Sequence, residues 1–349
     1  MTTLQIVTNF SRKVLAIGAM LFIGGLILYF GIKIGFAVKE TLHPTPPPPP
    51  TVTYGKLPEI TFPEQSNVPS FTYTVNTVEG TLPDLGDRVG VYKMQAVQPN
   101  LLALSNATAE VNKAGFASDP ITVSDTKYMW TNNETPQKSL TVDIQTNNFS
   151  LTSSYQNDTT VTQASNVPDH THALSTVNDF LTSINASPDD LDDSKTKVSL
   201  FAITNGVLTP ASSISSAQIV RVDLFQKDVD KLPIYYSQPS YSSMNFLLAS
   251  TDTGDPQIVE AHFFHQDISS DSATYPIKTA QQAVDDLKSG KAYIASYPTD
   301  ITQVTIRNIN LAYYISDTDQ QYLMPIIVLQ GDNNFFAYDS AVKDEWIGK

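Results

Sequence analysis

An uncharged apolar run near the N-terminus constrains this chain more than any other feature. No Asp, Glu, Lys or Arg occurs from Val14 to Ile32. At about 1.5 Å per residue, such a run makes a helix roughly 28 Å long, which matches the bilayer core. Lys33 can extend its ammonium group toward the headgroups, so the apolar segment continues to Val38. The sequence therefore predicts a cytoplasmic tail over residues 1–13 and one transmembrane helix over residues 14–38.

A cleaved signal peptide is the alternative to a retained anchor. Its apolar region usually spans about 7 to 15 residues and ends in a small-residue cleavage site. The run in this chain is longer, and the residues that follow it, 36–39, read FAVK. Arg12 and Lys13 directly precede the run, which favours an N-terminus in the cytoplasm and a C-terminal domain outside it. Gly31 and Gly35 have the G-x-x-x-G spacing that lets two membrane helices approach, so helix packing into a homodimer is a further hypothesis.

Proline is concentrated directly after the anchor. Residues 46–50 are all proline, and further prolines follow at positions 58, 63 and 69. Consecutive prolines lack amide donors and favour the extended polyproline II conformation. Residues 39–70 are therefore predicted to be a semi-rigid linker rather than part of a folded domain.

Composition excludes several classes of function for the rest of the chain. With 41% hydrophobic and 16% charged residues, the chain can bury a core and fold. The 35 Asp and Glu outnumber the 21 Lys and Arg, so nucleic acid is not an expected partner. There is no Cys, which excludes thiol catalysis and disulfides. No G-x-S-x-G, Walker A or dinucleotide-binding glycine motif occurs, so we expect neither catalysis nor a cofactor.

Two patterns alternate along residues 71–349. Apolar residues recur with helical period over 104–114, 174–184 and 280–287, and Gly115 and Gly290 stand where the first and third helices should end. Alternating β-type runs follow at 127–130, 140–144 and 149–151, and again at 292–297, 304–315, 322–329 and 335–342. The sequence predicts an α+β protein with two helix-plus-antiparallel-sheet units, residues 71–165 and 166–349.

The C-terminal part resembles a known family. Residues 280–294 read AQQAVDDLKSGKAYI, residues 304–316 read VTIRNINLAYYIS, and residues 321–331 and 335–342 read QYLMPIIVLQG and FFAYDSAV. This pattern over residues 279–346 is similar to the YycH/YycI-type regulatory proteins and the wider PepSY-like domains. The resemblance implies a single-pass protein of the bacterial envelope that modulates membrane sensors or proteases without catalysis. The long proline linker and the additional N-terminal α+β unit are departures from that pattern.

Asp169, His170 and His172 are the candidate metal ligands. In an extended segment, two imidazoles at i and i+2 lie on the same side, beside a carboxylate. No third or fourth ligand follows at a suitable spacing. The alternative is a polar start to the helix predicted from residue 174, and we expect no metal.

Aromatic residues give the candidate partner-binding positions. Adjacent aromatic residues on a strand face opposite ways, so one packs in the core and the other reaches a surface or a second layer. We select Tyr236, Tyr241, Tyr314 and Phe336 as candidate anchors for a partner, against the alternative that they pack within sheets.

These observations lead to one expected function and two alternatives. We expect a non-catalytic membrane-anchored protein that binds or regulates another protein of the cell envelope. An envelope hydrolase or metal-binding enzyme centred on residues 169–172 is one alternative. A surface-display or adhesive protein, lifted off the membrane by the linker, is the other.

Overall fold

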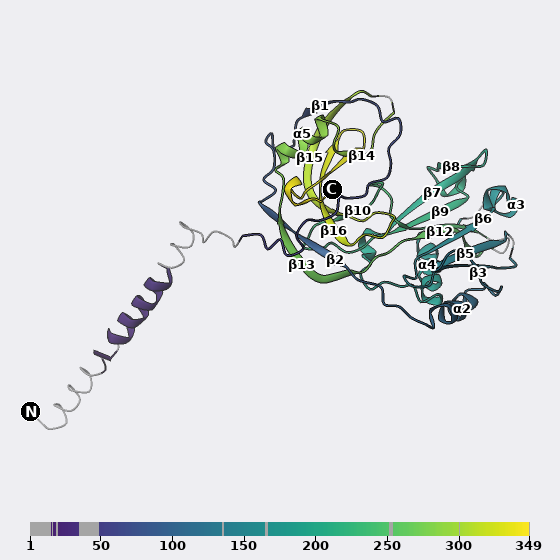
Figure 1. Ribbon diagram of the computed structural model, residues 1–349, viewed down its shortest axis with the longest axis horizontal. Coiled ribbons are helices and arrows are strands. Elements are labelled where there is room, and N and C mark those ends of the chain that lie inside the picture. The colour runs from purple at the N-terminus through teal and green to yellow at the C-terminus, as the bar shows by residue number, and fades with distance from the viewer. Residues whose placement is uncertain are drawn as a thin grey trace, which may run out of the picture. The chain divides into compact units, whose positions relative to one another are not determined.

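The structure is a computed structural model that describes residues 15, 17–18, 20–34, 49–134, 136–164, 167–250, 254–299 and 301–348. In the first of its two compact units, residues 20–34 are helical (Figure 1). Within the described part of the chain, no helix is both long and apolar enough to cross a membrane. The transmembrane helix over 14–38 therefore stays a prediction, and the tail over 1–13 lies outside the described residues.

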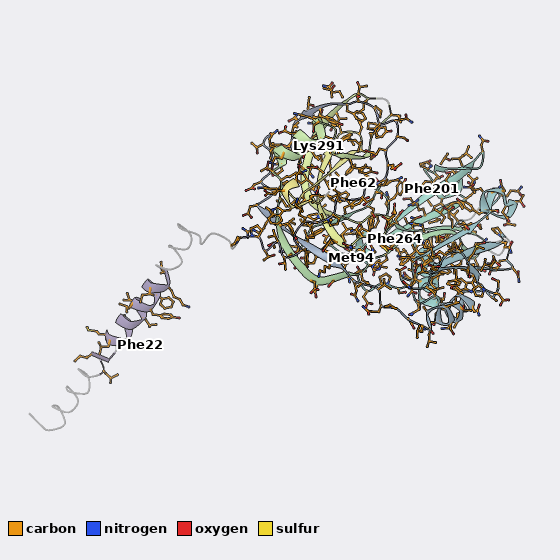
Figure 2. All side chains as sticks on the ribbon, viewed as in Figure 1. Phe22, Phe62, Met94, Phe201, Phe264 and Lys291 are labelled. Carbon is orange, nitrogen blue, oxygen red and sulfur yellow. The ribbon has the colours of Figure 1, made fainter. Side chains whose placement is uncertain are left out.

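The second unit begins at Pro50, well before the end of the expected linker over 39–70. Leu57 is completely buried, and the ring of Phe62, labelled in Figure 2, stacks on that of Tyr293. These apolar side chains pack against the folded unit, whereas the side chains of a spacer would make no such contacts. The linker prediction is thus corrected for residues 50–70, and residues 39–48 lie outside the described part.

Among the described residues, the first sheet has nine strands in the order β3-β4-β5-β6-β12-β11-β9-β7-β8 (Figure 1). All neighbouring pairs in it are antiparallel. The strands are β3 (Ile121–Thr122), β4 (Lys127–Thr131), β5 (Lys138–Asp143), β6 (Phe149–Ser153), β7 (Lys197–Thr204), β8 (Val207–Pro210), β9 (Ile219–Leu224), β11 (Met244–Ser250) and β12 (Pro256–Phe263).

Two helices cover one face of the first sheet, and a short third helix lies on the other face. Helices α2 (Ala103–Lys113) and α4 (His170–Ser183) bury Val111, Val177 and Leu181 in one cluster with Trp130 and Phe246 of the sheet. The short helix α3 (Thr159–Thr162) contributes Val161 to a smaller cluster on other strand residues. The sheet is therefore apolar on both sides, as expected for a strand layer between two coverings.

The second sheet, counted over the described residues, has eight strands. Its main order is β1-β15-β16-β17-β14, with β10 also on β15, and with β2 between β16 and β13. The strands are β1 (Thr72–Val75), β2 (Arg88–Met94), β10 (Ile234–Tyr235), β13 (Ile268–Pro276), β14 (Tyr293–Ser296), β15 (Gln303–Tyr314), β16 (Tyr322–Gly331) and β17 (Phe335–Ser340). Strands β1 and β10 run parallel to β15, an exception to the expected antiparallel pairing.

Alternation along β16 places two different layers on the second sheet. Ile327 and Leu329 join a cluster with Ala283, Val284 and Leu287 of helix α5 (Ala280–Lys288). The residues that alternate with them, Ile326 and Val328, face the opposite side, where the N-terminal segment of this unit lies. One face of the sheet is thus covered by a helix and the other by an extended segment.

The expected α+β class with two sheets is confirmed, but the sheets do not follow the expected division at residues 165 and 166. Strand β6 pairs with β12, so residues from both sides of that division form one sheet. Strand β2 pairs with β13 and β16 across the same division. These pairings join strands that are far apart in sequence, which local patterns do not reveal.

Candidate functional site

Two of the four aromatic candidates are interior residues. Tyr236 is 3% exposed and Tyr314 is 1% exposed. The backbone amide of Gln226 donates to the Tyr236 hydroxyl at 3.4 Å, and burial raises the pKa of that hydroxyl. Neither ring is accessible to a partner in this conformation, so packing accounts for both.

Tyr241 lies at a half-buried position beside two cations. The Arg221 guanidinium carbon is 4.3 Å from the centre of the Tyr241 ring, and the Lys197 ammonium is 5.4 Å from it. Both distances are within the range of cation–π attraction, which is worth about 0.5–1 kcal/mol at exposed sites. The ring is therefore fixed before any partner binds.

The loop that carries Tyr241 is fixed by an ion pair. Arg221 donates from Nε and Nη2 to the Asp223 carboxylate at 2.9 and 2.8 Å. Asp223 is completely buried and also accepts from the Ser242 amide at 3.1 Å. Lys197 donates to the Ser240 carbonyl at 3.2 Å on the other side of the tyrosine. Bidentate pairing holds the guanidinium plane against the ring.

Sequence reasoning selected Tyr241 but missed the residues that fix it. Arg221 and Asp223 alternate with apolar residues on β9, which places both charges on the same side of the strand. Two opposite charges at i and i+2 in an otherwise apolar strand were the signal. Lys197, at the start of the neighbouring β7, had no such signal, because its register with β9 depends on strand pairing.

Phe336 belongs to a group of aromatic side chains on the second sheet. Its ring centre is 6.4 Å from that of Tyr235, which is 5.7 Å from that of Tyr338. We call this group the aromatic face, and its members are Tyr235, Tyr293, Tyr314, Phe336 and Tyr338. Phe336 is half-buried, so the structure places it at the edge of this face and not on an open surface.

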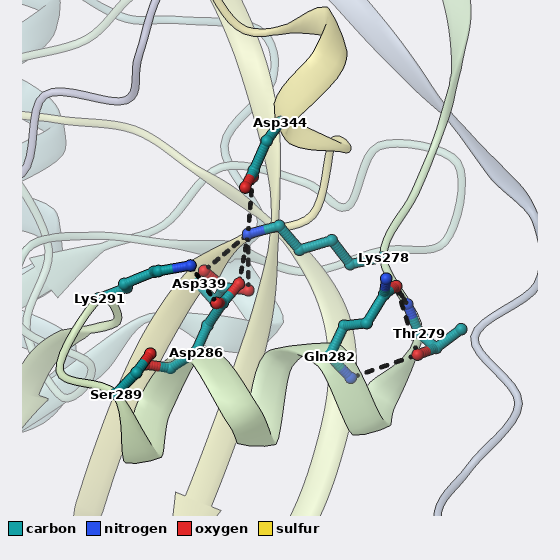
Figure 3. A network of polar contacts seen from close by, with 8 residues as sticks. All are labelled: Lys278, Thr279, Gln282, Asp286, Ser289, Lys291, Asp339 and Asp344. Atoms are coloured by element: carbon teal, nitrogen blue, oxygen red, sulfur yellow. Dashed lines mark hydrogen bonds and ion pairs between the residues drawn. The ribbon is translucent and has the colours of Figure 1, made fainter.

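A network of charges between α5 and the C-terminal residues was not expected from sequence (Figure 3). Lys278 is 8% exposed, and its Nζ is 2.8 Å from Asp286, 3.1 Å from Asp339 and 3.3 Å from Asp344. Lys291 approaches Asp286 at 3.1 Å from the solvent side. This network joins α5, β17 and the turn after β17.

The charges in this network perturb one another. Burial raises the pKa of the Asp339 carboxyl to about 6, although Lys278 opposes that rise. Burial also opposes the charged form of Lys278, but Asp339 and Asp286 raise its pKa above the usual value. Each side chain is already paired, so the network connects α5 to β17 and offers no free base.

Local chemistry at the start of α5 places Lys278 in this network. Thr279 caps the helix, because its hydroxyl accepts from the Gln282 amide at 3.3 Å. The Gln282 side chain accepts in turn from the Thr279 amide at 2.9 Å, which completes a capping box. The cap fixes the chain direction immediately after Lys278 and turns its side chain toward β17.

Asp169, His170 and His172 form the start of a helix. Helix α4 begins at His170, and Asp169 caps it by accepting from the His172 amide at 2.9 Å. That hydrogen bond lowers the pKa of the Asp169 carboxyl. On a helix, i and i+2 side chains point in different directions, so the geometry assumed for an extended segment is absent. No group of three potential metal ligands occurs among the described residues.

Asp190 belongs to a run of four acidic residues at positions 189, 190, 192 and 193, and it has partners from distant parts of the chain. Asp190 lies 2.8 Å from His265 Nε2 and accepts from the Gln226 side chain at 2.7 Å. Burial favours the neutral carboxyl, but the contact with His265 leaves the pKa of Asp190 below its usual value. This pair fastens the loop before β7 to the residues after β12.

Of the two glycines proposed for membrane helix packing, Gly31 is in the described helix and Gly35 lies outside the described residues.

No protein-family model matches this chain, and no curated protein matches it. Two solved structures are similar to it. One is an uncharacterized protein from Eubacterium rectale, with 13% identity and a TM-score of 0.39, over 74% of this chain and 84% of that one. The other is the C-terminal domain of YpeB from Bacillus megaterium, with 10% identity and a TM-score of 0.31, over 71% of this chain and 95% of that one. At these identities and TM-scores, neither likeness assigns a family or a function to this chain.

Proposed function

We propose that this chain is a non-catalytic, single-pass membrane protein that binds and regulates another protein of the cell envelope. Its N-terminus lies in the cytoplasm, and the unit that begins at Pro50 works on the other side of the membrane. The apolar run over 14–38 and the resemblance of residues 279–346 to YycH/YycI-type and PepSY-like proteins support this placement.

One observation carries the binding proposal. The Tyr241 ring packs beside Arg221 and Lys197, with Arg221 fixed in turn by Asp223. Tyrosine and arginine are enriched among the residues that dominate binding energy in protein interfaces. A ring that is already ordered loses little conformational entropy when a partner covers it. The Tyr241 loop is therefore a preorganised anchor.

Chemical cross-linking of cells that carry the full chain, followed by affinity capture and mass spectrometry, tests this function. We expect one membrane protein to be captured by the wild type and by Tyr241→Phe, which keeps the ring beside both cations. Tyr241→Ala should reduce that capture about tenfold or more, as expected for a dominant interface residue. Tyr128→Ala, at a half-buried tyrosine on β4, is the matched control and should leave capture unchanged.

The folding state of each variant completes the test. Tyr241→Ala should melt within a few degrees of the wild type, because only surface contacts are lost. Equal capture by the wild type and Tyr241→Ala would contradict the role of this loop. Capture of no protein from the same cell by any variant would contradict the regulatory function itself.

A further inference from the structure

An extended segment covers the aromatic face of the second sheet. We call residues 57–65 the strap. Leu57 is fully buried, Ile60 and Phe62 are half-buried, and the other residues of the strap are exposed. Within the described chain, no backbone–backbone hydrogen bond joins residues 58–71 to the sheet. Leu57 itself pairs with the C-terminal residues, because its amide donates to the Trp346 carbonyl at 2.8 Å and its carbonyl accepts from the Gly348 amide at 2.7 Å. The rest of the strap, residues 58–65, is held by a few side chains, which is typical of segments with low local stability.

Phe62 is the principal contact of the strap. Its ring stacks on Tyr293 with ring centres 4.8 Å apart and an interplanar angle of 1°. It also lies 4.8 Å from the Tyr314 ring and 6.3 Å from the Tyr338 ring. Aromatic pairs at these distances attract one another beyond the effect of the area that they bury. One side chain of the strap therefore fills the centre of the aromatic face.

Gln65 makes the contact that a neighbouring strand would make. Its Nε2 donates to the Ile294 carbonyl at 2.6 Å, and its Oε1 accepts from the Ile294 amide at 3.1 Å. Ile294 is on β14, which pairs only with β17 among the described strands and so forms an edge of the sheet. The Gln65 side chain therefore makes the two hydrogen bonds that the backbone of a neighbouring strand would make with Ile294. The β14 edge is one that can accept a strand.

The strap fits this surface incompletely. A cavity of about 320 Å³ lies beside Pro58, Ile60 and Thr61, and Tyr314 and Met324 of the sheet line it as well. The Tyr338 hydroxyl is buried and has no hydrogen-bond partner among the described residues. A buried polar group without a partner is unfavourable, because it has lost its hydrogen bonds to water. An occupant that filled the cavity, or one that supplied a partner to the Tyr338 hydroxyl, would bind better than the strap.

We infer that the aromatic face and the β14 edge form a peptide-binding surface, and that the strap is its resident occupant. The partner segment that displaces the strap is extended, carries an aromatic side chain, and follows it three residues later with a glutamine or with backbone that pairs with β14. That spacing is the one from Phe62 to Gln65, which fit the two parts of the surface. The identification of this segment as part of an envelope partner rests on the proposed function.

Peptide binding to the full chain in detergent tests this inference. The probe is a fluorescent peptide of residues 56–68, and the control peptide carries Phe62→Ala. The protein variant carries Phe62→Ala and Gln65→Ala together, which empties the surface, and Glu64→Ala is the matched control at an exposed strap position. We expect the probe to bind the double variant about tenfold or more tightly than the wild type or Glu64→Ala. The control peptide should not bind.

Melting temperature and molecular mass complete the experiment. The double variant should melt as one cooperative unit, because the core clusters of both sheets are unchanged. Equal affinity of the probe for the wild type and a folded double variant would overturn the inference. If the double variant unfolds, the wild type provides the test. Saturating probe should release the strap of the wild type, which is measured as faster tryptic cleavage at Lys56. No change in cleavage would overturn the inference. A dimer that forms through the strap would assign the surface to a second copy and overturn the partner assignment. Probe binding requires no envelope partner, so this inference and the proposed function can fail separately.

Discussion

Asp339 should make the folded protein less stable as the pH rises, which is opposite to the effect of a carboxylate in an ordinary ion pair. Replacement of Asp339 by asparagine should remove this pH dependence. Asp339 is 4% exposed, and its carboxylate faces Lys278 together with two other carboxylates, Asp286 and Asp344. Burial and the neighbouring acids raise its pKa from 3.8 to about 6 in the folded protein. Between these values, the folded state binds more protons at this group than the unfolded state does.

The sign and size of the effect follow from that difference. Stability falls as the pH rises wherever the folded state holds the extra proton, so Asp339 lowers the free energy of unfolding between about pH 4 and pH 6. A difference of about two pKa units corresponds to about 3 kcal/mol. At neutral pH, the ionised Asp339 therefore costs the fold about this amount relative to acid conditions, even with Lys278 beside it.

Urea unfolding of the full chain in detergent, followed by tryptophan fluorescence from pH 4 to pH 7.5, measures this effect. The free energy of unfolding of the wild type, relative to that of Asp339→Asn, should fall by about 3 kcal/mol across this range. Asp344→Asn, which removes an exposed acid of the same network, should keep the same direction of change with a smaller amplitude. A wild-type curve parallel to that of Asp339→Asn at every pH would show that the pKa of Asp339 is not raised in the folded protein.

Three further predictions follow from local contacts. Thr279→Ala removes the capping box of α5 and should lower the free energy of unfolding by about 1 kcal/mol, measured by urea unfolding; Thr279→Ser should restore it. Gly331→Ala places a Cβ 2.8 Å from Val304 and 3.1 Å from the Thr305 carbonyl, so it should cost about 1–3 kcal/mol in the same assay. His265→Ala should remove the stabilisation that Asp190 gives above its usual pKa, so that acid titration below pH 4 changes the variant less than the wild type. No loss for Thr279→Ala or Gly331→Ala, or equal acid sensitivity for His265→Ala and the wild type, would contradict the corresponding contact.

Local patterns were sufficient to predict the helices α2, α4 and α5, but not the short helix α3. The predicted helix over 280–287 is α5 at Ala280–Lys288, and Gly290 has a φ of 76°, as expected for a glycine that ends a helix. The strand run predicted over 304–315 is β15 at Gln303–Tyr314. These elements are specified by period, caps and turn residues, each of which acts over a few positions.

Pairings between distant strands could not be predicted in the same way. Nothing in the sequence of β6 indicates that it pairs with β12, more than a hundred residues later. The docking of Leu57 and Phe62 was hidden for the same reason, because their apolar partners come from the C-terminal strands. The proline-rich composition of residues 39–70 indicated a spacer. Only the contacts with distant strands show that residues 57–65 form the strap.

The candidate site was predictable to the extent that strand alternation applies. Tyr313 and Tyr314 point into different apolar clusters, as the alternation of adjacent aromatic residues requires. Alternation does not say whether the second cluster is open, and the strap covers it. Tyr241 belongs to a loop, so its accessibility depends on Arg221 and Lys197 and not on its own neighbours in sequence.

Site-specific photo-cross-linking from Gln238 tests whether a protein of the cell envelope covers the Tyr241 loop. Gln238 is exposed and accepts a hydrogen bond from the Tyr241 amide at 3.2 Å, so a photoreactive residue at this position reports on what covers the loop. Asn308, an exposed residue on β15, is the control position. We expect one discrete adduct with an envelope protein from position 238 and none from position 308. Absence of an adduct from position 238 in cells that contain the folded protein, or the same adducts from both positions, would contradict it.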